Sequence, residues 1–98
     1  MLYVVLFEDN PGLGADIRRK HMPAHLSFLE GHADRVRAAG PLRLPSDEPA
    51  GGLWLVDADS PDAVDALVKT DPFWSTGLRK SVRILEWLQV FAEGRRLA

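Results

Sequence analysis

The chain contains no cysteine. This absence excludes disulfide bonds, thiolate metal sites and a cysteine nucleophile, and it fits the reducing cytoplasm, where we expect the protein to act. The chain also lacks any apolar run near the roughly 20 residues that a membrane-spanning helix needs. The apolar run at residues 2–7 is too short for the core of a signal peptide and is followed by two acids, so we expect no targeting segment.

The chain also has no large excess of positive or negative charge. The net charge of -2 gives no electrostatic reason to expect a nucleic acid or an anionic membrane as a partner. The basic runs at residues 18–20 and 95–96 are too short for a nucleic-acid patch. With 98 residues, 46% of them hydrophobic, the chain can form one domain around one core. We therefore expect residues 1–98 to be a single domain, with a tail at about 92–98 that can fray.

Four segments are expected to form strands, at residues 2–7, 35–44, 52–57 and 81–91. The first and third are apolar on both alternating faces, so both faces should be buried. The second contains Gly40-Pro41. Because proline cannot donate to a ladder, this strand should be bulged there or lie at an edge of the sheet. Alternation in the last strand places four apolar residues in the sheet: Val82, Ile84, Leu88 and Val90.

Two helices are expected between these strands. Proline is unfavourable inside a helix but well tolerated at its first position, so we expect a helix that begins at Pro23, or a kink there, after one or two helical turns at 14–20. The second helix starts clearly, with Ser60 as N-cap and Pro61 at the first position. It ends at Asp71-Pro72, because a residue before proline avoids helical backbone. Its buried stripe consists of Val64, Leu67 and Val68.

The elements follow in the order β-α-β-β-α-β. This order predicts an α+β, ferredoxin-like fold, in which a four-stranded antiparallel sheet carries two helices on one face. Helices in so small a domain can cover only one face, so the other apolar face needs a ligand pocket or a second subunit. We expect a homodimer through this open sheet face and a small-molecule ligand in a cleft between sheet and helices.

One set of segments recurs, in order and spacing, in a known family: the opening strand, Pro23-Ala24-His25-Leu26, Ala39-Gly40-Pro41-Leu42, the helix at 60–68, and Asp71-Pro72-Phe73 followed by Gly77-Leu78. Over nearly its whole length the chain resembles the YCII-related domain proteins. The resemblance implies a dimeric α+β barrel with an active site built from His25 and Asp71. A few relatives are enzymes, among them a dehydrochlorinase that acts on a chlorinated hydroxyquinol.

One position departs from the family pattern. Relatives often carry arginine three residues before the site histidine, and this chain has Met22 there. Arg19 or Arg18, from the preceding turn, could take its place. If neither does, the resemblance no longer implies anion binding of the family's kind.

Histidine is the side chain whose charge changes near neutral pH, so His25 in a cleft can take or give a proton. A carboxylate at its other ring nitrogen would fix the tautomer and stabilise the imidazolium. We therefore predict His25 and Asp71 as the catalytic pair. The plainer alternative is that His25 is a half-buried helix residue and Asp71 a turn former. The candidate substrate-binding residues are Arg19, Gly40, Pro41, Phe73, Trp74 and Ser81, with the aromatic pair suited to a flat ring.

Other chemistries are less well supported. His21, His25 and His32 have spacings that zinc ligands use, but Pro23 disturbs the helical register between them. We therefore predict no metal and no cofactor. No Gly-x-Ser-x-Gly elbow surrounds any of the candidate serine nucleophiles, Ser27, Ser75 and Ser81.

Two functions remain open. The first is a small cofactor-independent enzyme that uses the pair for general acid–base chemistry on a small organic substrate, aromatic or halogenated, in an elimination, isomerisation or hydrolysis. The second is a non-catalytic dimeric module that binds a metabolite or assists another protein. Met22 and the apolar sheet face favour the second.

Overall fold

The computed structural model describes residues 1–12 and 14–98. The elements of the main body are β1 (Leu2–Asp9), α1 (Gly14–Gly31), β2 (Val36–Arg43), β3 (Pro49–Asp57), α2 (Pro61–Thr70) and β4 (Arg79–Glu86). A 3-10 turn at Trp74–Thr76 precedes β4, and two short strands, β5 (Phe91–Ala92) and β6 (Arg95–Arg96), follow it. This order confirms the ferredoxin-like βαββαβ fold. No helix in the described part of the chain is long and apolar enough to cross a membrane.

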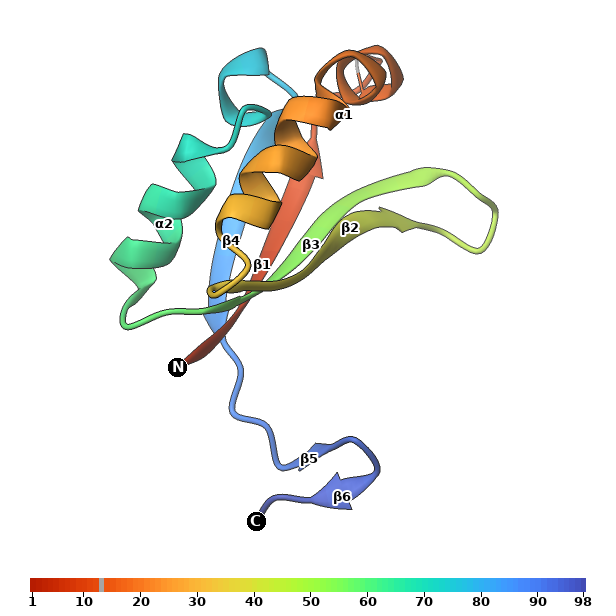
Figure 1. The fold of residues 1–98 in the computed structure, drawn as a ribbon. Helices are drawn as coiled ribbons and strands as arrows, with labels where there is room; N and C mark the ends of the chain where they lie inside the picture. Colours follow the sequence, from red (N-terminus) through yellow and green to blue (C-terminus); the bar gives the residue numbers. More distant parts are fainter. Residues whose placement is uncertain (13) are drawn as a thin grey trace.

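The main sheet is antiparallel throughout, with the strand order β2-β3-β1-β4. The second strand lies at the edge, as its proline predicts, and its register against β3 shifts between Pro41 and Arg43. Both helices cover one face of the sheet, while the β2–β3 hairpin extends beyond them (Figure 1). This hairpin and the first half of α1 become the two sides of the candidate site.

The prediction that a helix begins at Pro23 is wrong, because α1 is continuous from Gly14 to Gly31 and contains this proline. The alternative of a kink describes the helix better. Figure 1 shows its first half end-on and its second half running down across the sheet. Proline lacks the N–H that would bond to the carbonyl of Arg19, and its ring pushes that turn apart, which bends the helix. The bend brings the second half of α1 onto the sheet.

The predicted last strand is wrong at both ends, since β4 begins at Arg79 and ends at Glu86. Leu88 and Val90, which alternation places in the sheet, are 78% and 67% exposed. The reason is that β4 pairs only with β1, whose own start at Leu2 leaves nothing further to pair with. The remaining residues, 87–98, form a C-terminal arm that ends in the β5–β6 hairpin and hangs away from the main body (Figure 1).

The core lies between the inner sheet face and the helices. Strands β1 and β3 contribute Tyr3, Val5, Phe7, Trp54 and Val56, and α2 contributes Val64, Leu67 and Val68. This confirms the predicted stripe of α2. Its predicted cap is also present, because the Ser60 hydroxyl oxygen accepts a hydrogen bond of 3.1 Å from the Ala63 N–H.

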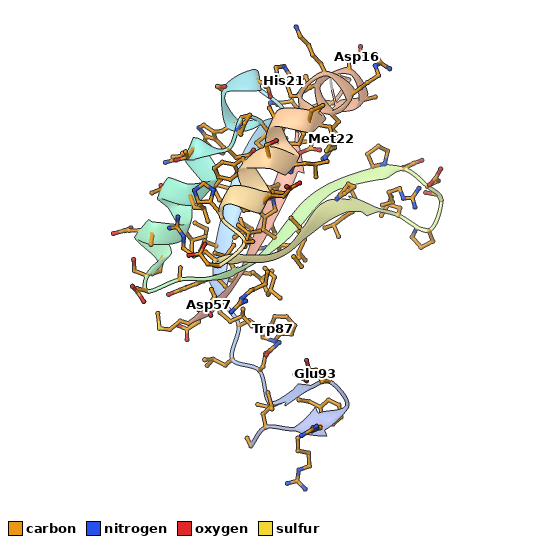
Figure 2. The ribbon with its side chains drawn as sticks, in the orientation of Figure 1. Asp16, His21, Met22, Asp57, Trp87 and Glu93 are labelled. Atoms are coloured by element: carbon orange, nitrogen blue, oxygen red, sulfur yellow. The ribbon has the colours of Figure 1, made fainter. Side chains whose placement is uncertain are left out.

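The opposite sheet face remains open in the single chain. Its apolar side chains are the partly buried Leu2, Val4, Leu6, Leu53 and Leu55, together with the 41% exposed Leu85, and the charged Glu8 and Arg83 lie on the same face. No helix of the described chain covers this face (Figure 1). The C-terminal arm continues from this sheet, and Trp87, near the base of the arm, is exposed. Figure 2 shows Trp87 and Glu93 along the arm.

Gly51 is needed where β3 passes beside β1. Its φ is +90°, and a Cβ atom there would lie 1.9 Å from the backbone oxygen of Phe7. We expect Gly51→Ala to lower the free energy of unfolding by more than about 3 kcal/mol, since backbone would have to move. Gly77→Ala is the matched control: its φ is +81° but its Cβ would meet nothing within 4 Å. It should cost only about 1 kcal/mol of backbone strain. Urea unfolding followed by circular dichroism measures both, and equal losses would contradict the steric account.

Candidate functional site

His25 is the buried residue of α1, and it faces the end of α2. Its Nδ1 lies 2.7 Å from Oδ1 of Asp71, and the two side chains are only 8% and 3% exposed. The sequence separation is 46 residues, so the fold alone brings them together. The structure therefore contains the predicted His25–Asp71 pair as a buried hydrogen bond.

The local chain aims the carboxylate of Asp71. This residue ends α2 in an extended conformation, with φ −61° and ψ 134°, as expected before Pro72. Its Oδ1 also accepts a hydrogen bond of 3.4 Å from the N–H of Phe73, two residues on. Such an Asx turn ties the side chain to its own backbone and leaves it little freedom to leave the histidine.

The hydrogen bond also determines which tautomer the neutral ring adopts. A carboxylate can only accept, so Nδ1 carries the proton and Nε2 keeps a free lone pair. Within the described chain Nε2 has no hydrogen-bond partner, and His25 forms part of the wall of a pocket. This is the arrangement that a general base requires.

Aromatic rings hold the plane of the imidazole. Phe73 stacks on it, with ring centroids 4.1 Å apart and planes 19° apart. Trp54 lies on β3 with its centroid 6.2 Å away. Both rings are buried. The histidine is therefore positioned by packing as well as by Asp71, which reduces the motion that would misalign Nε2.

The pocket beside His25, here called the inner pocket, has a volume of about 100 Å³. Its walls come from α1, β2, β3 and β4: Arg18, Met22, His25, Leu26, Leu29, Ala39, Gly40, Pro41, Trp54 and Arg79. A wider outer groove of about 830 Å³ shares Arg18 and Pro41 with it and lies between the start of α1 and the β2–β3 hairpin. Figure 2 shows Met22 on the part of α1 beside this hairpin.

Two residues of the site were not predicted from the sequence. Asp9 and Arg79 are paired across β1 and β4, and Arg79 Nη1 lies 3.1 Å from Asp9 Oδ1. Arg18 Nη2 lies 2.6 Å from the second oxygen of Asp9. The last strand was expected to begin at Ser81, two residues after its actual start, which left Arg79 outside the predicted sheet. Extending that strand against the first would have placed Arg79 opposite Asp9.

The guanidinium of Arg79 is nearly inaccessible, with its side chain 4% exposed. It lies 4.1 Å from the ring centre of Phe7, in cation–π contact. Burial lowers the pKa of Arg79 from its ordinary value, while the hydrogen bond and charge of Asp9 act in the opposite direction. Gly52 provides the space beneath, because a Cβ there would come within 3.2 Å of Nη1.

The structure brings Gly40 and Pro41 into the wall of the inner pocket with His25. Phe73 stacks on His25 but is not part of the pocket wall, and the other predicted binding residues, Arg19, Trp74 and Ser81, do not reach the pocket. Arg19 is 78% exposed and paired with Asp16, which Figure 2 shows at the far end of α1. Arg18 reaches the site from the same turn of the helix.

Trp74 lies outside the walls of the inner pocket and packs against the core, with the Lys69 ammonium 5.9 Å from its ring centre. Ser81 pairs with Glu8 on the open sheet face and donates a hydrogen bond of 3.2 Å to Oε1 of that residue. It is therefore on the opposite side of the sheet from His25.

The histidines do not converge. Nδ1 of His32 is hydrogen-bonded to the backbone carbonyl oxygen of Phe28, at 2.8 Å. Nδ1 of His25 is instead hydrogen-bonded to Asp71. Within residues 1–12 and 14–98, no three His, Asp or Glu side chains are grouped as ligands for a metal ion.

Comparison with known proteins now adds to this geometry. One solved structure, the 5-chloro-2-hydroxyhydroquinone dehydrochlorinase TftG from Burkholderia phenoliruptrix AC1100 in complex with 2,5-dihydroxybenzoquinone, is 27% identical, with a TM-score of 0.77 over 90% of this chain and 94% of that one. An uncharacterised NIPSNAP domain protein from Burkholderia xenovorans is 13% identical, with a TM-score of 0.53 over 93% and 96% of the two chains, and shares the fold alone.

A comparison with curated proteins finds no match. The YCII-related domain, however, matches residues 1–88, which is the main body of the chain and the start of its arm. The chain therefore belongs to the family of YCII-related domain proteins.

Proposed function

We propose that this protein is a small enzyme that moves a proton on a small organic substrate without a cofactor, with His25 as general acid and base and Asp71 as the residue that orients it. The observation that carries this proposal is the buried 2.7 Å hydrogen bond between the two residues, of which His25 lies in the wall of a pocket. A purely structural histidine would be expected to have both ring nitrogens paired when buried. Here Nδ1 is paired, Nε2 has no partner within the described chain, and His25 lies in the wall of the inner pocket.

The proposed step follows from the tautomer. Nε2 takes a proton from a carbon or hydroxyl group of the substrate, and Asp71 stabilises the imidazolium that forms. In an elimination, the electron pair of the broken bond forms a new double bond, and the leaving group departs with its own pair. In an isomerisation, the same histidine returns the proton at another position. In either case His25 ends the cycle neutral, after giving its proton to product, leaving group or solvent.

We propose an aromatic or halogenated ring as the substrate. The inner pocket has apolar walls at Met22, Leu26, Leu29 and Trp54, which suit a flat apolar body. The likeness to a dehydrochlorinase that was solved with a dihydroxybenzoquinone, at 27% identity over most of both chains, supports the same choice.

A non-catalytic binding module is the second candidate, and Met22 is the observation that favours it. Met22 lies in the wall of the inner pocket, at the position where the family resemblance leads us to expect arginine. A methionine there supplies packing but no charge. Under this alternative the pocket would bind its ligand unchanged, and His25 would serve only as a hydrogen-bonding group.

We further propose that the chain acts as a homodimer through the open sheet face. The six leucine and valine side chains of that face and the exposed apolar residues of the arm support this proposal, as does the barrel that the family resemblance implies. Burying such a surface is favourable by roughly 25 cal/mol for each Å² of apolar area.

Turnover tests the enzyme directly. Chloride release from 5-chloro-2-hydroxyhydroquinone should be measurable for the wild type and should fall about 100-fold or more in His25→Gln, because the general base is lost. His21→Gln is the matched control on the same helix and should keep the wild-type rate. Release that is equal in His25→Gln and the wild type would contradict the role of His25. Binding of 2,5-dihydroxybenzoquinone without any chloride release would favour the module instead.

The dimer is tested by light scattering. We expect the wild type to have twice the mass of the chain and Val4→Lys to have the mass of one chain, because a charge in the middle of the open face would be buried on association. Ala66→Lys, on the exposed side of α2, should leave the dimer intact. A wild type that remains a monomer at all concentrations would rule out this proposal.

A further inference from the structure

Arg79 combines deep burial with few hydrogen bonds. Its side chain is 4% exposed, yet within the described chain its one hydrogen bond runs from Nη1 to Asp9. A guanidinium has five N–H donors, so most of those of Arg79 have no partner in the described chain, although none of its nitrogens is fully buried without a partner. Because Arg79 forms part of the inner pocket wall, the pocket is where its remaining donors can be satisfied.

Arg18 brings a second guanidinium to the same place. The carboxylate of Asp9 bridges the two arginines, at 2.6 Å from Arg18 and 3.1 Å from Arg79. The single carboxylate of Asp9 therefore pairs with two guanidinium groups, which leaves a net positive charge on the three side chains. Asp9 itself borders the outer groove and not the inner pocket. Asp71, which is buried more deeply than Asp9, is directed at His25.

The inner pocket is therefore one-sided in charge. The described residues of its wall include two guanidinium groups and no carboxylate, while the remaining wall is mostly apolar. The aromatic ring of Phe7 stacks on Arg79 at 4.1 Å and the ring of Phe73 lies 5.5 Å away, so this guanidinium is held in one orientation. A fixed guanidinium with free donors matches an oxygen anion in both charge and geometry.

We propose that Arg18 and Arg79 form an anion subsite beside His25, and that the pocket takes an organic oxyanion, namely an aromatic carboxylate or an ionised phenol or enol. This inference rests on the proposed function, because it names the charge of the substrate for the same site. The ring of the ligand lies against Trp54 and the apolar side of α1, and its anionic oxygen lies at the two arginines. Negative charge that grows on that oxygen when Nε2 removes a proton is stabilised there.

The test measures binding of unreactive probes by NMR titration of the protein at low salt. Benzoate and pentafluorophenolate are the anions, and benzamide and pentafluoroanisole are their uncharged counterparts. We expect at least one anion to bind about tenfold or more tightly than its counterpart, the effect of a charge-assisted hydrogen bond. The ratio of affinities between anion and neutral counterpart is compared for the two pairs. A larger ratio for benzoate identifies a carboxylate subsite, and a larger ratio for pentafluorophenolate identifies a phenolate subsite.

Variants then assign the preference to the arginines. Arg18→Gln should remove most of the preference for the anion. Arg19→Gln is the control, because it removes an exposed arginine of the same helical turn, and it should keep the preference. The double variant Asp9→Asn/Arg79→Gln removes the more buried guanidinium together with the carboxylate that pairs with it, while Arg18, which also loses Asp9, is 21% exposed and can be solvated. This variant should also lose the preference.

Four results would overturn the inference: equal affinity for anion and neutral probe, a preference that survives both variants, a loss in Arg19→Gln alone, or failure of every probe to bind. None of the probes undergoes turnover, so the outcome is separate from that of the proposed enzyme. Chloride release with no anion preference would leave the role of His25 standing and remove only the subsite.

Discussion

The hydrogen bond between His25 and Asp71 is the contact on which the rest of the site depends. It links the middle of α1 to the end of α2 across the inner sheet face, between residues 46 positions apart. A hydrogen bond to a charged group contributes about 1.5–3 kcal/mol net, whereas a buried carboxylate that loses its partner costs about 3–5 kcal/mol. The pair is therefore held together more by the cost of separation than by the strength of the bond. Pro72 and the stacked ring of Phe73 keep both partners in the required places.

A second polar contact organises the charge around that pair. Asp9 and Arg79 face each other across neighbouring strands, and Arg18 joins them from α1. This contact depends on backbone detail, because Gly51 lets β3 pass close to the backbone of Phe7 and Gly52 leaves room for the guanidinium of Arg79. The proposed acid–base chemistry at His25 and the proposed anion recognition at the arginines thus share one pocket wall but come from separate structural causes.

Local signals in the sequence predicted much of this structure. The Ser60 cap, the proline that limits β2 to an edge, and the turn at Asp71-Pro72 each depend on a few neighbouring residues. The pairing of His25 with Asp71 came from the family resemblance, because no local pattern links residues so far apart. The same limit explains the missed arginine: Arg79 becomes a site residue only through its strand partner Asp9.

The errors in the predicted elements have a similar origin. Pro23 was expected to start a helix by its local preference, but packing of α1 on the sheet keeps the helix continuous through a kink. Leu88 and Val90 alternate as a strand would, but β1 begins at Leu2 and β4 pairs with it only as far as Glu86. Arg18 and Arg19 are equivalent in sequence, and only the direction in which α1 enters the fold separates the one in the pocket from the one in solvent.

The most direct test of the account is the protonation state of the two ring nitrogens of His25, measured by nitrogen-15 NMR of the neutral ring. We expect the wild type to carry its proton on Nδ1, bonded to Asp71, and to leave Nε2 free. In Asp71→Asn, whose amide can donate to Nδ1 instead, the tautomer with the proton on Nε2 should appear. His32, bonded through Nδ1 to a backbone carbonyl, is an internal reference that should not change. A proton on Nε2 in the wild type, or a ring whose tautomer is the same with and without the aspartate, would contradict the account.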